Sequence, residues 1–308
     1  MTQEERFKAY IETLKQEAKL RGISDATIQA AFKNVAFKPH AVKADNNQPE
    51  KKLTLDEYIP RAVPAWKVKQ AKALYQENYD DLKRIGEQFG VQPRFIVALW
   101  GVESNFGKFT GNYNVVSALA TLAFDGRREE LFRKQTMAAL QIIDEGHISA
   151  ENMKGSWAGA MGQCQFMPTS FLAYAADGNG DGKKDIWKTK QDVFASTANY
   201  LKTEGWDDSY TWGRQIKVPH GINPDLQGRD AEKGKMLQEW AQLGITDLDG
   251  SPLPTLDKDI KAWLIMPDDE DGRSYLVYNN YNVLMHWNRS YYFAIAVSTL
   301  ADKIVDKD

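Results

Sequence analysis

Most apolar residues of this chain recur at the spacing of an α-helix. Residues 4–20 place Phe7, Ile11, Leu14 and Ala18 on one helical face, which predicts an amphipathic helix. The same periodicity predicts further helices over residues 65–79, 80–88, 115–123, 128–145, 194–204 and 282–300. The chain is therefore expected to be mainly helical.

Residues that start or interrupt helices divide this pattern. Ser24 is a favourable N-cap for a second helix that runs to about Lys33. The polar stretch Lys38–Lys52 contains Pro39 and Pro49 and is expected to be an exposed linker. A proline also opens the apolar helix of residues 93–104, where the first turn tolerates it.

The pattern of the sequence changes from long helical segments to short ones after residue 205. Five prolines punctuate short segments such as RQIKVP and AWLIMP, which favours a small, partly β insertion with one helical piece over Asp230–Leu243. The predicted fold class is mainly α (α+β). The predicted segments are an N-terminal helical region and linker (1–55), a core (56–204), the insertion (205–275) and a C-terminal helix that completes the core (276–308).

Composition excludes several classes of protein. The 308 residues carry a formal charge of −3, so the sequence predicts no nucleic-acid partner. The longest apolar stretches, such as Phe95–Val102, are far shorter than the roughly 18 residues of a membrane span. The single cysteine, Cys164, cannot form an intrachain disulfide. The polar start fits either a cytoplasmic protein or one whose export signal has been removed.

Glu103 is the first candidate for chemistry. On its helix it shares a face with Ile96, Leu99 and Trp100, and Gly107 is expected to end the helix soon after. Apolar surroundings and the negative end of the helix dipole both raise the pKa of a carboxyl group, as a general acid requires. The alternative is a glutamate that turns into solvent or pairs with an arginine.

A second candidate is the acidic loop DGNGDGKKDIWK. Asp177, Asn179 and Asp181 fall at positions 1, 3 and 5 of a calcium loop, and Gly182 supplies the turn at position 6. Oxygen ligands at alternate positions of a tight turn converge on one hard cation. Position 12, however, is Lys188 rather than glutamate. Asp185 or Asp192 could supply the missing carboxylate, and the alternative is a turn without an ion.

Other patterns point to binding rather than to metal or thiol chemistry. The histidines at 40, 147, 220 and 286 have no zinc-ligand spacing, and Cys164 is expected to be a small buried residue. No phosphate-binding glycine loop is present. Aromatic residues in polar contexts suit a saccharide cleft as a group, although each alone is more often core: Tyr58, Trp157, Tyr200, Tyr278, Tyr281 and Trp287.

Five blocks together resemble one family. ALWGVESNFG, GSWAGAMGQCQFMPTSF, DGNGDGKKDIW, TANYLKTEGW and YNNYNVLMHWNRSYYFAIAV match, in order and spacing, the lytic transglycosylase B family of murein-cleaving enzymes. The resemblance runs from about Asp56 to Ala301. It implies a goose-type-lysozyme-like catalytic core.

The resemblance also implies roles for single residues. Glu103 matches the family's catalytic acid. The implied substrate contacts are Ser156, Gln165, Tyr200, Tyr278 and Asn279, and less strongly Tyr58. The implied structural Ca²⁺ site comprises Asp177, Asn179, Asp181, Lys183 through its carbonyl, and Asp192, which one extra residue after Trp187 displaces. Gln163 and Cys164 depart from the family, since an aromatic residue and a glycine are expected there.

The implied reaction needs one carboxyl group. Glu103 protonates the bond between N-acetylmuramic acid and N-acetylglucosamine and then deprotonates the C6 hydroxyl, which leaves a 1,6-anhydro end. The alternatives are a hydrolytic muramidase and a non-catalytic glycan-binding module. The resemblance implies no organic cofactor, a monomer, peptidoglycan strands and cell-wall synthases as partners, and a periplasmic location, either free or anchored to the outer membrane.

Overall fold

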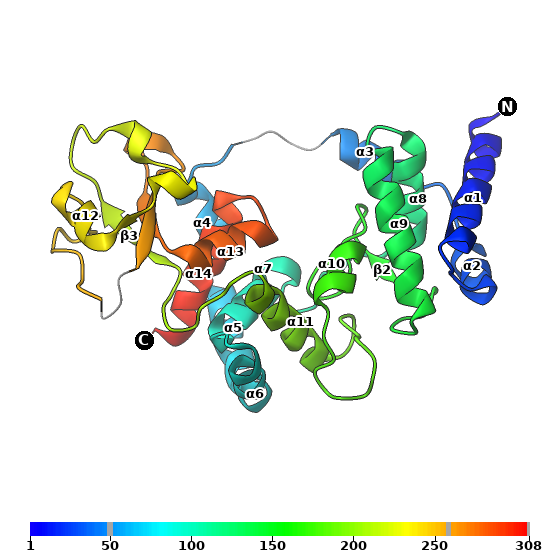
Figure 1. The fold of residues 1–308 in the computed structure, drawn as a ribbon, viewed down its shortest axis with the longest axis horizontal. Coiled ribbons are helices and arrows are strands. Elements are labelled where there is room, and N and C mark those ends of the chain that lie inside the picture. Colours follow the sequence, from blue (N-terminus) through cyan, green and yellow to red (C-terminus); the bar gives the residue numbers. More distant parts are fainter. Residues whose placement is uncertain (48–51, 257–259, 307–308) are drawn as a thin grey trace. The chain divides into compact units, whose positions relative to one another are not determined.

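The computed structural model describes residues 1–47, 52–256 and 260–306 (Figure 1). Its contacts divide the chain into two compact units, each built from two separate stretches of sequence. Unit 1 comprises Met1–Lys51 and Leu99–Tyr200, and unit 2 comprises Lys52–Ala98 and Leu201–Asp308. Two of the three boundaries between the units fall within helices, α7 (Pro93–Ser104) and α11 (Lys190–Thr203). The four segments predicted from sequence stay a prediction.

Unit 1 is built almost entirely from helices. They are α1 (Gln3–Leu20), α2 (Asp25–Phe32), α3 (Pro39–Asn46), α8 (Val115–Asp125), α9 (Glu129–Asp144) and α10 (Pro168–Tyr174), together with most of α11. Helices α8 and α9 pack along each other, and both contact α1 and α2 (Figure 1). The short strands β1 (Tyr113–Asn114) and β2 (Lys154–Gly155) pair antiparallel.

The first two helices match their predictions. The buried residues of α1 are the four predicted ones, Phe7, Ile11, Leu14 and Ala18. Ser24 caps α2, because its side chain accepts a hydrogen bond from the backbone N–H of Thr27. Local spacing and cap chemistry therefore suffice to define this part of the fold.

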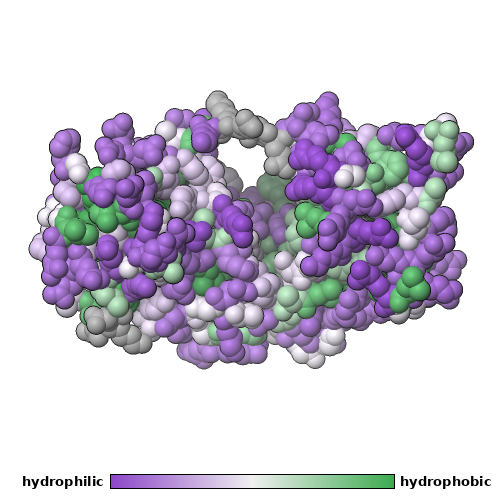
Figure 2. Space-filling view, turned by 45° about the horizontal axis from the view of Figure 1, so that its top comes forward, coloured by the Kyte–Doolittle hydropathy of each residue, from purple (hydrophilic) through white to green (hydrophobic). Residues whose placement is uncertain are grey.

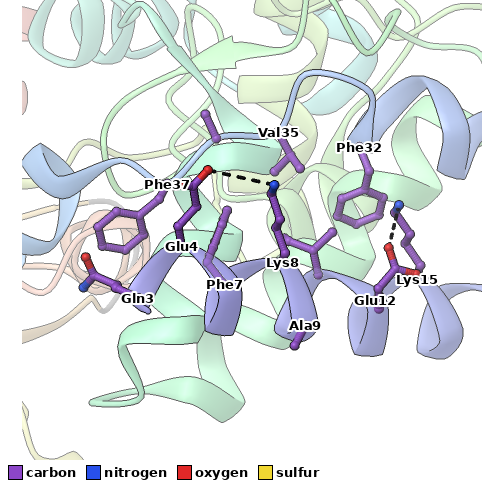
Figure 3. A pocket seen from close by; sticks show the side chains of 12 residues that line it. Gln3, Glu4, Phe7, Lys8, Ala9, Glu12, Lys15, Phe32, Val35 and Phe37 are labelled. Atoms are coloured by element: carbon purple, nitrogen blue, oxygen red, sulfur yellow. Dashed lines mark hydrogen bonds and ion pairs between the residues drawn. The ribbon is translucent and has the colours of Figure 1, made fainter. Parts of the chain in front are cut away.

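A cavity of about 690 Å³ lies between α1 and the segment that follows α2 (Figure 3). Phe7, Phe32 and Phe37 contribute to its apolar lining. Two ion pairs of α1, Lys8 with Glu4 and Lys15 with Glu12, lie along its edge. None of its twelve lining residues is a predicted site residue.

The predicted linker Lys38–Lys52 is wrong over its first half, where α3 forms. Pro39 occupies the first turn of this helix, where its missing N–H costs no hydrogen bond. Asp45 is 3% exposed and pairs with Arg127 and Arg128. The burial of α3 thus depends on distant partners. The second half of the prediction includes residues 48–51, which lie outside the described residues.

Unit 2 combines helices with an antiparallel sheet. Its helices are α4 (Leu55–Ala62), α5 (Ala65–Glu77), α6 (Tyr79–Phe89), α12 (Leu237–Gln242), α13 (Asn279–Trp287) and α14 (Tyr291–Val305), with the 3₁₀ turns η1 (Pro224–Leu226), η2 (Ala231–Lys233) and η3 (Asp269–Asp271). The strand order is β4-β6-β7-β3-β5. The strands are β3 (Gly213–Lys217), β4 (Lys235–Met236), β5 (Thr246–Asp247), β6 (Lys261–Ile265) and β7 (Ser274–Val277).

The sheet carries the hydrophobic core of the region predicted to be partly β. Register pairs such as Gly213 with Val277 and Leu264 with Leu276 align its central strands. Trp240 is fully buried in this core, and its indole N–H donates to the carbonyl of Ala262 at 3.0 Å. The mainly helical α+β prediction is confirmed by these elements.

Two predicted helices are wrong in their extent. Residues 230–243 form η2, β4 and the short α12 instead of one helix. Residues 282–300 belong to two helices, because the backbone is extended at Asn288 and Ser290 caps α14 through the N–H of Phe293. Among the described residues, no helix combines the length and apolar character that crossing a bilayer requires. The face shown in Figure 2 is mostly hydrophilic, with small separate hydrophobic patches.

Replacing Leu264 by alanine tests the core of unit 2. Its side chain is fully buried, so the Leu264→Ala change should lower the free energy of unfolding by about 2–5 kcal/mol. Leu248→Ala is the matched control, because Leu248 is 56% exposed and should change stability by less than about 0.5 kcal/mol. Urea denaturation followed by circular dichroism measures both. Equal losses would contradict this description of the core.

Candidate active site

Glu103 is the next-to-last residue of α7. The predicted apolar face of this helix is buried, since Ile96, Leu99 and Trp100 are each at most 2% exposed. Glu103 itself is half-buried. Its carboxyl group therefore extends from the last turn of a helix whose apolar face is buried.

The helix ends in an unusual way. It stops at Ser104, and three successive residues then adopt positive φ: Asn105 (48°), Phe106 (59°) and Gly107 (88°), the residue expected to end the helix. Non-glycine residues rarely adopt this left-handed conformation, which persists only where surrounding contacts enforce it. The chain thus leaves the helical conformation two residues after Glu103.

Hydrogen bonds from residue 163 and Ser104 hold this helix end. The Ser104 hydroxyl donates to the carbonyl of Gln163 at 2.8 Å and accepts the N–H of Gly107 at 3.0 Å. The Trp100 indole N–H donates to Gln163 Oε1 at 2.8 Å. Gln163 therefore contacts the turn of α7 that carries Glu103. In the sequence, residue 163 stands out only because the family resemblance leads us to expect an aromatic residue there.

The loop after the helix end connects Glu103 to two predicted substrate contacts. Gln165 donates its amide hydrogens to the carbonyls of Thr110 and Gly162, at 3.1 and 2.9 Å. Gly111 lies so close to Gly155 that a Cβ there would come within 2.1 Å of its carbonyl oxygen. Ser156 follows Gly155 directly. Unit 1 therefore gathers Glu103, Ser156 and Gln165 around one short loop.

Ser156 and Gln165 each keep one hydrogen-bonding group that no described residue uses. The Ser156 oxygen accepts the N–H groups of Ala158 and Ala160, at 3.2 and 3.0 Å, which leaves its hydroxyl hydrogen as a donor. Among the described residues, Gln165 Oε1 has no hydrogen-bond donor, since the amide nitrogen makes both bonds of this side chain. The pair can thus offer a ligand one donor and one acceptor.

The aromatic candidates are more buried than a cleft lining requires. Tyr200 is 5% exposed, and its ring centroid lies 4.2 Å from that of Tyr174. Tyr278 is 1% exposed in the unit 2 core, where its hydroxyl accepts a hydrogen bond from Arg214 at 3.3 Å. Burial counts against a direct sugar contact for either ring. Tyr278 is thus a core residue whose hydroxyl has a hydrogen-bond partner.

The two remaining candidates also belong to unit 2. Tyr58, on α4, is half-buried and stacks edge to face on Tyr292, with ring centroids 5.5 Å apart. Burial raises the pKa of the Tyr58 hydroxyl. Asn279 is exposed at the first position of α13. The predicted role of Tyr58 and Asn279 as substrate contacts remains an expectation.

The acidic loop brings three carboxylates together. One oxygen each from Asp177, Asp181 and Asp192 lies within 4.8 Å of the others. Backbone N–H groups orient them, since Asp177 accepts from Gly180 and Gly182, at 2.9 and 2.7 Å. Gly182 has φ of +84°, which the turn requires. The extra residue after Trp187 therefore does not keep Asp192 away from the cluster.

Asp192 is the buried member of this cluster. Its two oxygens accept the N–H groups of Gly178 and Asp185, each at 2.7 Å. The pKa of Asp192 is raised to about 6, because desolvation and, to a smaller extent, the charges of Asp177 and Asp181 outweigh the lowering by those two hydrogen bonds. Burial also raises the pKa of Asp177, but backbone hydrogen bonds outweigh this effect and leave the pKa lowered. Like charges gathered around one point suit a hard cation.

Comparisons with known proteins find similar sequences and similar structures. Residues 6–302 match the model of the family described as Transglycosylase SLT domain. Membrane-bound lytic murein transglycosylase B of Escherichia coli (strain K12) is 33% identical over 250 residues, which span 80% of this chain and 66% of that protein. The chain thus spans just under two thirds of the length of this curated relative.

Solved structures are similar over nearly the whole chain. SltB3 from Pseudomonas aeruginosa, in complex with NAG-anhNAM-pentapeptide, is 38% identical with a TM-score of 0.93, over 97% of this chain and 79% of that one. Escherichia coli Slt35 in complex with calcium is 26% identical with a TM-score of 0.82, over 96% of this chain and 92% of that one.

The thiol of Cys164 should be inert in the folded protein. It is 2% exposed, and burial raises its pKa to about 12, while a hydrogen bond with Thr197 lowers it and the charge of Glu103 raises it. The thiolate is the reactive form, so alkylation at pH 8 should be slow in buffer and fast in denaturant. Iodoacetamide labelling followed by mass spectrometry measures both rates. Rapid labelling of the folded protein would contradict this burial.

Proposed function

Because the chain belongs to the Transglycosylase SLT domain family, we propose that it is a lytic transglycosylase that cleaves the glycan strands of peptidoglycan. The single observation that carries this proposal is the family match over residues 6–302. The structural similarity to SltB3, whose complex holds NAG-anhNAM-pentapeptide, supports the substrate class.

Glu103 is the proposed general acid and then the general base. In its protonated form it donates its proton to the glycosidic oxygen between N-acetylmuramic acid and N-acetylglucosamine, and the C1–O bond breaks. The 2-acetamido oxygen of the muramoyl residue stabilises the positive charge at C1. Ionised Glu103 then accepts the proton of the C6 hydroxyl, whose oxygen bonds to C1. The product is a 1,6-anhydromuramoyl end, and no water is consumed.

The two neighbouring side chains supply orientation in this proposal. The Ser156 hydroxyl can donate to a substrate carbonyl, and Gln165 Oε1 can accept from a substrate N–H or hydroxyl. Both groups stand on backbone that hydrogen bonds fix, so they bind without ordering a flexible loop. Orientation of this kind lowers the barrier by holding the reacting atoms close together.

Calcium is the proposed structural ion of the acidic loop. The donor set fits, because Asp177, Asp181 and Asp192 offer converging oxygens, and Ca²⁺ prefers oxygen ligands. Asn179 and the carbonyl of Lys183 complete the proposed ligands. The ion would neutralise the mutual repulsion of the carboxylates and join the loop to the start of α11. The calcium complex of Slt35 supports this assignment.

The substrate class also supports a location. Peptidoglycan strands lie outside the cytoplasmic membrane, so we propose that the protein acts in the periplasm. The curated Escherichia coli relative is membrane-bound by name. A lipid-anchored form, a monomeric state and cell-wall synthases as partners remain predictions.

Replacing Glu103 by glutamine should lower cleavage of purified sacculi by at least about 100-fold, because a glutamine can neither donate nor accept the required proton. Mass spectrometry of the released muropeptides measures the rate and the product. Glu130→Gln is the matched control, since Glu130 is exposed on α9, and it should retain wild-type activity. Wild-type rates in Glu103→Gln would contradict the assignment, and reducing ends from the wild-type protein would indicate a muramidase.

Calcium should stabilise the protein through the acidic loop. At a calcium concentration about 100 times the Kd, the melting temperature should rise by roughly 5 °C. Asp181→Asn should abolish most of this rise, whereas Asp125→Asn, an exposed change at the end of α8, should preserve it. Calorimetry with calcium and with EDTA measures the effect. An equal rise in melting temperature in the wild type and both variants would mean that calcium binds elsewhere.

A further inference from the structure

We propose that Gln163 is a positioning residue for the general acid, because it joins the end of α7 to the segment that closes the acidic loop. The proposal rests on the proposed function of Glu103. Gln163 makes four hydrogen bonds, two on each side. Toward α7 it accepts from Trp100 Nε1 and from the Ser104 hydroxyl, each at 2.8 Å.

The other two hydrogen bonds of Gln163 reach the end of the acidic loop. Its backbone N–H donates to the carbonyl of Ile186, and its side-chain Nε2 donates to the carbonyl of Trp187, each at 2.9 Å. Asp185 continues the connection, since its backbone N–H donates to Asp192 and its carboxylate accepts the N–H of Trp187. The Gln163 side chain therefore joins the acid's helix to Trp187, which Asp185 links in turn to Asp192.

The surrounding backbone is shaped to fit this carboxamide. A Cβ at Gly107 would lie 2.4 Å from Gln163 Oε1, so the glycine leaves the space that the side chain fills. A Cβ at Gly162 would lie 2.7 Å from the carbonyl oxygen of Ile186. Both glycines also have positive φ, of +88° and +63°. Gly107 thus lies against the carboxamide of Gln163, and Gly162 lies against Ile186, to which Gln163 bonds.

The carboxamide of Gln163 serves both partners. The indole of Trp100 needs an acceptor and the carbonyl of Trp187 needs a donor, and the glutamine side chain supplies one of each. A leucine of similar size would leave both groups without their partner. A glutamate would keep the acceptor for Trp100 but would place a second acceptor against the Trp187 carbonyl.

The hydrogen bonds of Gln163 hold the helical turn that carries Glu103. It lies between Trp100 and Ser104 in the last turn of α7, and Gln163 binds both of these residues. A small displacement of this turn would move the carboxyl group relative to the glycosidic oxygen. Misplacement by about 1 Å can cost roughly 100-fold in rate without weakening substrate binding.

The test compares Gln163→Leu with Gln141→Leu, an exposed glutamine of α9, on a soluble peptidoglycan tetrasaccharide. Gln163→Leu should lower kcat by about 10–100-fold with KM within about twofold, well below its melting temperature. Gln141→Leu should leave both constants unchanged. A kcat within twofold of wild type, or a rise in KM alone, would overturn the proposal.

Two further variants separate positioning from folding. Gln163→Glu retains the side-chain size and the hydrogen bond from Trp100. It replaces Gln163→Leu in the test if that variant does not fold, with the same expected changes in kcat and KM. Trp100→Phe removes the indole donor together with part of a buried ring system, and its effect on kcat should be less than additive with that of Gln163→Leu. Full additivity would overturn the coupling. Reducing ends from the wild-type protein would instead refute the proposed function, leaving the kcat comparison valid.

Discussion

Hydrogen bonds from outside helix α7 fix the end of that helix, where Glu103 lies. The last carbonyls of any helix lack partners within it, and such ends fray easily. Here the Ser104 hydroxyl donates a hydrogen bond to the carbonyl of Gln163. Asn105 and Phe106, which follow the helix, adopt left-handed conformations that cost about 1–3 kcal/mol each. The surrounding contacts must offset that cost. The proposed acid therefore stands on a rigid element rather than on a loop, as proton transfer at a fixed distance requires.

Local sequence signals predicted most of the helices. The apolar face of α1 and the Ser24 cap follow from spacing and side-chain chemistry alone, and both are present. Pro39 was misread, because a proline can either interrupt a helix or start one, and the choice depended on tertiary burial of α3. The break between α13 and α14 had a visible signal in Ser290, an N-cap inside an otherwise continuous apolar pattern. The family predicted from the sequence blocks is confirmed by the match over residues 6–302.

The candidate site was only partly visible in the sequence. Motif resemblance identified Glu103 and placed Asp192 with the acidic loop, and the structure brings Asp192 to Asp177 and Asp181. Composition could not separate a cleft tyrosine from a core tyrosine, so the burial of Tyr278 was not foreseen. The sequence marked Gln163 only as a departure from the family, because the partners of its side chain lie 63 residues before it and 24 residues after it. Long-range partners of this kind follow from tertiary structure.

The central claim is that one carboxyl group, held at the end of α7, both donates and recovers a proton while the C6 hydroxyl of the sugar replaces water. Digestion of purified sacculi in heavy-oxygen water tests it most directly, with mass spectrometry of the new glycan ends. The account predicts 1,6-anhydromuramoyl ends that carry no heavy oxygen and are lighter than a reducing end by one water. Reducing ends labelled with heavy oxygen at C1 would contradict it, since they require attack by solvent.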